Sequence, residues 1–479
     1  MRTMLVSFAV VTLLLCPAIG HAQDGQATLE RAARAMGAST LNSIEFTGSG
    51  ASFAVGQSPV AGASWPRFNL KSYTRSMNYE TGSLRQEQVL SRADPQPRGG
   101  GLPAMGEARQ TFLLSGEHAW TLAPAGPVPG PRYLAELQLQ LWTSPHGVIK
   151  AAMANKATVQ GRTIAFTVPG KLKARASLDS GNLVQRVEAV FSSPVLGDMP
   201  FEVSYADYRD FGGIKFPMRI RQSAGKFPSL DLTVDDVRPN ARVDIDVPDP
   251  VRQATNPYAK VTTQQVADGI WYLTGGSHHS VVLEMRDHLI LVEAPLNDAR
   301  ALAVVAEARK LVPNKPVRYV IASHHHFDHS GGVRAAVGEG ATLITHESSR
   351  AYFERVLAAP ATVSPDHLAK SGRKAKVEGV RDKRMLTDGT RTVEIHHIAG
   401  NLHEDGLLMV YLPKEKLLIE ADAFSPAPPN APPPAVVNPN TVNLADNITK
   451  LGLSVDQILP IHGRMVPLAE LHKTIGRAN

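Results

Sequence analysis

The pattern of apolar and polar positions divides the chain into two parts. Apolar residues between 27 and 40 recur at helical spacing and end at Gly37, which predicts a helix. From residue 44 onward, short alternating runs separated by Gly, Pro, Asn or Asp are typical of antiparallel strands. The clearest predicted strands are 164–168, 183–187, 201–205, 216–220 and 230–234, with helical stretches near 133–142 and 147–155. Residues 23–247 are therefore predicted to form a mainly antiparallel β (α+β) accessory domain.

The second part alternates strands with a helix. A Pro- and Asp-containing linker at 248–262 precedes predicted strands at 269–273, 280–284 and 289–292, a helix at 298–311 and a strand at 317–321. In α/β sheets, functional side chains gather at the carboxyl ends of the strands. Residues 263–479 are therefore predicted to form a separate domain, with a site directly after residue 321.

Metal-ligating side chains follow that last strand in the sequence SHHHFDHSGG at 323–332. Imidazole nitrogen and carboxylate oxygen are ligands of zinc-class ions. Because alternate side chains of an extended segment point to one side, His324 and His326 can share one ion, whereas His325 should point away. Asp328 and His329 can then reach a second ion. Two adjacent metals with an open coordination position are typical of hydrolytic sites.

The composition restricts what this site can contain. Cys16 is the only cysteine, so a metal centre must be built from His, Asp and Glu. Fourteen of the 17 histidines follow residue 260, where Lys and Arg balance Asp and Glu at 23 each. The excess positive charge is spread over residues 1–260 without a basic run, which argues against nucleic acid as a partner.

The first 22 residues have the pattern of a cleaved export signal. Arg2 supplies a positive end, residues 5–16 are apolar, and Gly20-His21-Ala22 is a small-x-small cleavage site. We expect cleavage after Ala22, a periplasmic or secreted protein, and no stable membrane span afterwards. The alternative is a retained N-terminal anchor.

With this order of elements around the H-x-H-x-D-H pattern, residues 261–479 resemble the metallo-β-lactamase superfamily. The resemblance implies an αβ/βα sandwich and three further ligands, in Gly400-Asn401-Leu402-His403, Leu418-Ile419-Glu420-Ala421-Asp422 and Pro460-Ile461-His462. It implies that His324, His326 and His403 bind one metal, that Asp328, His329 and His462 bind the other, and that Asp422 bridges them. The N-terminal part resembles periplasmic lipoprotein-carrier-like β domains in its strand pattern.

The chain departs from the family pattern at two places. Glu293 stands where an Asp is usual, and no Thr or Ser follows His403. A bridging carboxylate at Asp422, where some true β-lactamases have Cys, is more similar to the glyoxalase, lactonase and phosphodiesterase branches.

The resulting hypothesis is an exported hydrolase with two zinc ions, manganese or iron being alternatives. A metal-bound hydroxide would attack an ester, lactone, thioester or amide of a small molecule, with Asp328 as the catalytic residue. The alternatives are a true β-lactamase and a non-catalytic carrier or sensor of an apolar ligand.

Three further segments are candidates for substrate contact. His278 and His279 lie on a predicted turn near the mouth of the site. The proline-rich segment 424–440 is either a surface loop or a wall over the metals, and the region 346–385 is a candidate for the opposite wall. The substrate and the oligomeric state do not follow from the sequence.

Overall fold

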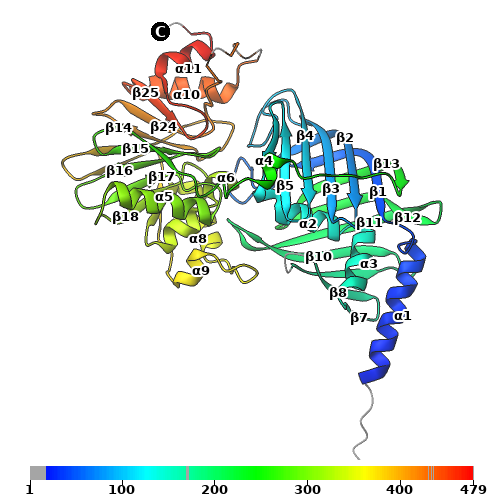
Figure 1. Ribbon diagram of the computed structural model, residues 1–479. Helices are drawn as coiled ribbons and strands as arrows, with labels where there is room; N and C mark the ends of the chain where they lie inside the picture. The colour runs from blue at the N-terminus through cyan, green and yellow to red at the C-terminus, as the bar shows by residue number, and fades with distance from the viewer. Residues whose placement is uncertain (1–17, 169–171, 430, 433, 435, 478–479) are drawn as a thin grey trace, which may run out of the picture.

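The computed structural model describes residues 18–168, 172–429, 431–432, 434 and 436–477. In Figure 1 the chain forms two units that lie side by side, one coloured blue to green and the other green to red. The predicted export signal falls mostly on residues 1–17, outside the described part. No helix among the described residues combines the length and apolarity needed to cross a bilayer.

The N-terminal unit is one antiparallel sheet of 13 strands, which confirms the predicted class. The strand order is β6-β5-β4-β3-β2-β1-β13-β12-β11-β10-β9-β8-β7, so the first and last strands of the unit, β1 and β13, pair in its middle. The strands are β1 (Ser43–Phe53), β2 (Arg67–Asn78), β3 (Ser83–Arg92), β4 (Glu107–Ser115), β5 (His118–Ala123), β6 (Gly126–Pro129), β7 (Thr158–Gln160), β8 (Thr163–Val168), β9 (Leu172–Leu178), β10 (Val184–Ser193), β11 (Gly197–Phe211), β12 (Ile214–Ala224) and β13 (Phe227–Pro239).

The core of this unit lies between the sheet and three helices. The helical elements are α1 (Ala18–Met36), η1 (Pro131–Tyr133), α2 (Leu134–Trp142) and α3 (Pro145–Ala154). Helix α1 ends before Gly37, whose φ of 67° is the left-handed conformation that terminates helices. Leu29 and Met36 of α1 pack in one cluster with residues of α2, α3 and the sheet. Along β8 buried positions alternate with more exposed ones, as expected for a sheet with one covered face.

The C-terminal unit contains two sheets, of seven and six strands. A short helix, α4 (Asp249–Arg252), lies in the predicted linker. The first sheet has the order β14 (Thr262–Ala267), β15 (Ile270–Thr274), β16 (Ser280–Glu284), β17 (Leu289–Val292), β18 (Val317–Ile321), β19 (Thr342–His346) and β20 (Val377–Val380). The second has the order β21 (Lys383–Thr387), β22 (Thr392–His397), β23 (Leu408–Leu412), β24 (Leu417–Glu420), β25 (Gln457–Pro460) and β26 (Val466–Pro467).

These sheets form the inner layers of a four-layer sandwich. One apolar cluster, including Ile290 and Val410, fills the space between the sheets. A second packs helices against the outer face of the first sheet, and a third packs helices against the outer face of the second. The helices are α5 (Asp298–Leu311), α6 (Phe327–Ser330), α7 (Val333–Gly338), α8 (Glu347–Leu357), α9 (His367–Ser371), α10 (Pro439–Lys450) and α11 (Leu468–Thr474). The predicted αβ/βα sandwich is therefore confirmed.

The connection between β1 and β2 joins the two units beside the histidine run. The Phe327 amide donates to the Gly56 carbonyl at 3.2 Å, and the Asp405 amide donates to the Pro59 carbonyl at 2.9 Å. The segment 94–105 lacks regular structure but is anchored. The Gly99 amide donates to the Leu402 carbonyl at 2.8 Å, and the Arg92 guanidinium donates to carbonyls of the same loop.

Candidate metal centre

The histidine run follows β18 at the carboxyl end of a parallel strand, as the sequence predicts. The side chains of His324, His326 and His329 are at most 1 % exposed. His325 points away and places Nδ1 3.1 Å from Glu404 Oε1, which agrees with the predicted alternation. The short helix α6 begins after His326 and directs Asp328 and His329 toward the centre.

Four predicted ligands converge in a first group: His324, His326, His403 and Asp422. Their ligand atoms all lie within 4.8 Å of one another. His403 Nε2 lies 3.3 Å from His324 Nε2 and 2.8 Å from Asp422 Oδ2. Asp422 follows β24 with a φ of 61°, a left-handed conformation that is costly for a residue with a Cβ and is often found at functional sites.

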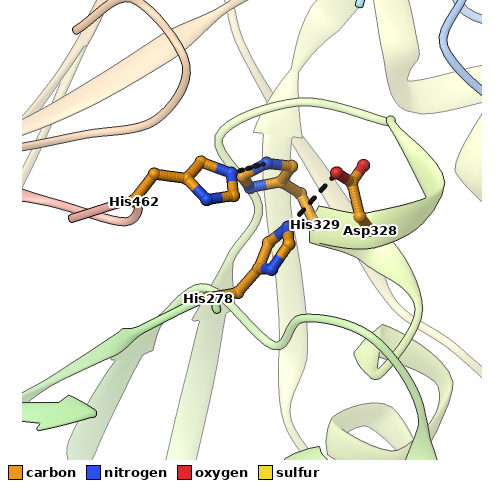
Figure 2. Close-up of side chains that lie close together, drawn as sticks. All are labelled: His278, Asp328, His329 and His462. Atoms are coloured by element: carbon orange, nitrogen blue, oxygen red, sulfur yellow. Dashed lines mark hydrogen bonds and ion pairs between the residues drawn. The ribbon is translucent and has the colours of Figure 1, made fainter. Parts of the chain in front are cut away.

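A second group lies beside it and consists of His278, Asp328, His329 and His462, again within 4.8 Å of one another (Figure 2). His462 Nε2 lies 3.1 Å from His329 Nε2. Asp422 reaches this group as well, because its Oδ1 is 2.9 Å from His462 Nε2 and its Oδ2 is 3.1 Å from His329 Nε2. The carboxylate of Asp422 thus stands between the two groups, where a bridging ligand would be.

The hydrogen bonds of the imidazoles leave one ring nitrogen of each facing the centre. Ser323 Oγ lies 2.8 Å from His324 Nδ1, and Glu293 Oε2 lies 2.7 Å from His329 Nδ1. His326 places Nε2 2.8 Å from the Ser58 carbonyl, and its buried Nδ1 has no hydrogen-bond partner among the described residues. Outer partners of this kind orient the histidine ligands of metals. The residues therefore fit two adjacent divalent ions.

Protonation also favours cation binding. Burial lowers the pKa of His324 to about 4 and that of His326 well below its usual value, so both are neutral near pH 7 and able to bind a metal. Burial alone would raise the pKa of Asp328 and Asp422, but the neighbouring histidines, His329 foremost, hold both well below the usual value. The same carboxylates raise the pKa of His329 well above its usual value against the effect of burial, so a cation bound here would displace the proton of His329. Two ionised carboxylates in a buried site need a positive charge beside them.

Sequence reasoning missed three residues of the N-terminal unit that lie at this centre. Gln57 Nε2 donates to Asp328 Oδ1 at 2.8 Å, and the Ser58 carbonyl contacts His326. A Cβ added at Gly100 would lie 3.0 Å from His326 Nδ1 and would collide with the Gln57 side chain, so a larger residue there would displace Gln57 from its present position. Nothing local in the sequence marks these positions, because each contact joins residues more than 200 positions apart.

The two histidines of the β15–β16 turn have different surroundings. His278 lines the cavity at the centre, with Nε2 3.2 Å from Asp328 Oδ2 and Nδ1 2.9 Å from Ser277 Oγ. His279 turns away from that cavity. Its Nε2 lies 2.8 Å from the Gly463 carbonyl, and its ring meets the edge of Tyr272.

The centre opens into a cavity of about 1470 Å³ between the two units. One wall is the proline-rich segment, including Pro428, Pro432 and Val436. The opposite wall is formed by the N-terminal unit, with Gln57, residues 99–102 and Arg132. The expectation that region 346–385 forms this wall is wrong. Its helix α8 packs on the outer face of the first sheet, away from the cavity.

Comparison with known proteins assigns the domain that carries this centre. The sequence model described as the metallo-beta-lactamase superfamily matches residues 273–453. This segment includes His324, His326, Asp328, His329, His403 and Asp422. No curated protein matches the chain.

Solved structures of metallo-beta-lactamases match a little under half of the chain. The enzyme from Pontibacter korlensis is 16% identical, with 45% of this chain and 98% of that chain covered and a TM-score of 0.36. FIM-1 from Pseudomonas aeruginosa, in its mono-zinc form, is 18% identical, with 45% and 92% covered and a TM-score of 0.35. The enzyme from Hirschia baltica is 18% identical, with 46% and 99% covered and a TM-score of 0.35. The carrier-domain resemblance of the N-terminal unit has no counterpart among these matches.

Proposed function

We propose that this chain, which carries a metallo-β-lactamase superfamily domain over residues 273–453, is a hydrolase that uses two metal ions. The observation that supports this most directly is the pair of adjacent His/Asp groups with the Asp422 carboxylate between them. Bound there, two divalent ions such as zinc would acidify a water molecule and polarise the scissile group. Manganese and iron are alternatives, because His/Asp sites accept several metals.

The side chains have distinct roles in this proposal. His324, His326 and His403 would hold one ion, Asp328, His329 and His462 would hold the other, and Asp422 would contact both. Asp328 is the catalytic residue, because its ionised carboxylate faces the cavity and can orient the attacking water and accept its proton. Gln57 donates to one oxygen of this carboxylate, and His278 Nε2 lies 3.2 Å from the other.

We further propose that the substrate is a small molecule of extended shape with an ester, lactone, thioester or amide bond. The cavity of about 1470 Å³ exceeds the roughly 300–1,000 Å³ of typical small-molecule sites. Leu102 and Val436, which are 70% and 59% exposed, place apolar side chains on opposite walls. An extended, partly apolar substrate suits this lining better than a compact one. A β-lactam remains an alternative substrate, and a non-catalytic carrier or sensor of an apolar ligand the alternative class.

The N-terminal pattern supports export, with the mature protein beginning after Ala22. The proposed setting is therefore the periplasm or the exterior. A small molecule is the expected partner, and nucleic acid is not.

The first experiment is metal analysis combined with a hydrolysis panel. The purified chain is assayed on a chromogenic β-lactam, a lactone, a thioester, an aryl ester and a phosphodiester, before and after chelation. We expect about two ions per chain and chelator-sensitive turnover of one carbonyl class. A folded protein that binds no metal would exclude the hydrolase.

Substitution of the catalytic carboxylate tests its role separately. Asp328→Asn is expected to lower kcat at least 100-fold while leaving the fold intact, since general-base groups contribute roughly 10²–10⁴-fold. Asp287→Asn is the matched control, because Asp287 is an exposed carboxylate paired with Arg318. Equal activity of the two variants would remove Asp328 from the mechanism.

A further inference from the structure

We infer that His278 is a protein ligand of the second metal, so that each metal would have three imidazoles, with Asp328 on the second metal and Asp422 shared between the two. This inference rests on the proposed function, and it adds a ligand to the seven that the family resemblance implies. His278 lies on the β15–β16 turn, 46 residues before the histidine run begins.

The first argument is the composition of the two groups. The group around the first metal contains His324, His326, His403 and Asp422. The second contains His278, His329, His462 and Asp328, with ligand atoms equally close to one another. Without His278 the second metal would have only two imidazoles beside Asp328, and would depend on Asp422 to complete four protein ligands.

The second argument is how the ring of His278 is held. Its Nδ1 lies 2.9 Å from Ser277 Oγ, just as the Nδ1 of His324 lies 2.8 Å from Ser323 Oγ. In both cases the preceding serine fixes the ring and leaves Nε2 facing the centre. The Ser277 carbonyl also lies 3.1 Å from His462 Nδ1, so one residue orients two imidazoles of the same group. Partners of this kind accompany metal-bound histidines.

The third argument is the position of the His278 ring. Figure 2 shows His278 reaching toward Asp328 and His329 from the side opposite the ribbon that carries Asp328. Its ring centroid is 4.1 Å from that of His462 and 5.0 Å from that of His329. The residue is only 4% exposed, and its Nε2 faces the same space as the ligand atoms of Asp328, His329 and His462.

A competing role is that of a hydrogen-bond donor alone, since His278 Nε2 lies 3.2 Å from Asp328 Oδ2. The variant His278→Gln separates the two roles, because a glutamine amide can still donate to the carboxylate but is a poor metal ligand. His278→Ala removes both interactions. His279→Gln is the matched control, because His279 is the next residue and bonds to the Gly463 carbonyl outside the group.

The test counts imidazole ligands directly. The full chain, labelled with nitrogen-15 in histidine and loaded with cadmium-113, is examined by NMR for imidazole nitrogens that couple to cadmium. We expect couplings from His278 as well as from His324, His326, His329, His403 and His462. In His278→Gln the other histidines should still couple. The affinity for the second metal, measured by chelator competition, should fall by at least the roughly 10–100-fold that loss of an outer partner costs.

The outcomes distinguish this inference from the proposed function. Absence of a His278 coupling in the wild-type chain, or an unchanged second-metal affinity in His278→Gln, would overturn the inference and leave the hydrolase standing. Absence of bound metal in the wild-type chain would overturn both. Ser277→Ala is a second variant in case His278 variants fold poorly. It should weaken the second metal while preserving the Ser277 carbonyl contact to His462.

Discussion

At the scale of single residues, Glu293 shows how this chain orients His329, one of the proposed metal ligands. Its side chain is fully buried, with Oε2 2.7 Å from His329 Nδ1 and Oε1 accepting the Ser323 amide at 2.6 Å. Its φ of 67° is an unusual conformation for a residue with a Cβ. One carboxylate therefore connects the end of β17 to both ends of the histidine run.

Glu293→Asp is expected to weaken this support, although Asp is the usual residue in the family that this domain resembles. The side chain is one methylene shorter, so it cannot keep both contacts without a backbone shift. We predict a roughly 10–100-fold lower affinity for the second metal, measured by chelator competition. Glu284→Asp, which shortens a half-exposed carboxylate on β16, is the control. Equal affinities would show that Glu293 is not needed to orient His329.

The residues also show what the sequence could and could not predict. The ligands of the histidine run could be predicted because they lie within six positions. His403, Asp422 and His462 could be predicted only because the segments that carry them resemble those of a known family. Gln57 and Gly100 could not be predicted. Their roles arise from packing between two units, and such contacts leave no periodicity or spacing in a single sequence.

At the scale of elements, the β1–β2 connection is the part of the N-terminal unit that acts on the centre. We predict that Gln57→Ala lowers kcat about tenfold, because Asp328 loses a hydrogen bond at Oδ1 and can rotate. Gln86→Ala is the control, because Gln86 bonds to Tyr73 and Arg75 within the same sheet. The measurement is kcat and KM on the substrate found in the panel. A change in KM alone would indicate substrate contact instead of a role in positioning Asp328.

Helix α3 makes the N-terminal core sensitive to acid through His146. The ring is fully buried, stacks on Phe216 and contacts the Met36 carbonyl of α1 through Nε2 at 3.0 Å. Burial lowers its pKa from 6.5 to about 4, so the folded protein binds this proton less readily than the unfolded chain does. Neutral His146 therefore makes its full contribution to the free energy of unfolding above pH 6.5, and this contribution is lost as the pH falls toward 4.

The corresponding prediction concerns urea unfolding at two pH values. Between pH 7 and pH 5, His146 should remove about 2 kcal/mol from the free energy of unfolding. In His146→Gln the free energy of unfolding should fall by about 2 kcal/mol less over the same pH range than in the wild-type chain. Other titrating groups contribute equally to both proteins. Parallel pH dependence in the two proteins would contradict the assignment.

At the scale of the whole molecule, the function proposed here belongs to the two units together. The C-terminal unit supplies the two His/Asp groups, and the sheet of 13 strands supplies one wall of the cavity, a contact to Asp328 and a contact to His326. A second junction lies apart from the metals. There the Asp198 carboxylate of β11 accepts hydrogen bonds from the Thr362 and Val363 amides at 2.8 and 2.9 Å. If docking of the units shapes the centre, loosening the Asp198 junction should also loosen the contact between the β1–β2 connection and the histidine run.

Asp198→Ala tests this dependence without touching the centre. The charge-assisted bonds to Thr362 and Val363 are worth about 1–2 kcal/mol at this partly exposed position, so the domains should separate more often. We expect faster amide hydrogen exchange at residues 360–363 and, through the shared docking, at 56–59 and 326–328. Asp231→Ala, which removes an exposed partner of Arg221 on the same sheet, should change neither region. Faster exchange confined to residues 360–363 would mean that the β1–β2 connection holds the metal centre independently of the rest of the interface.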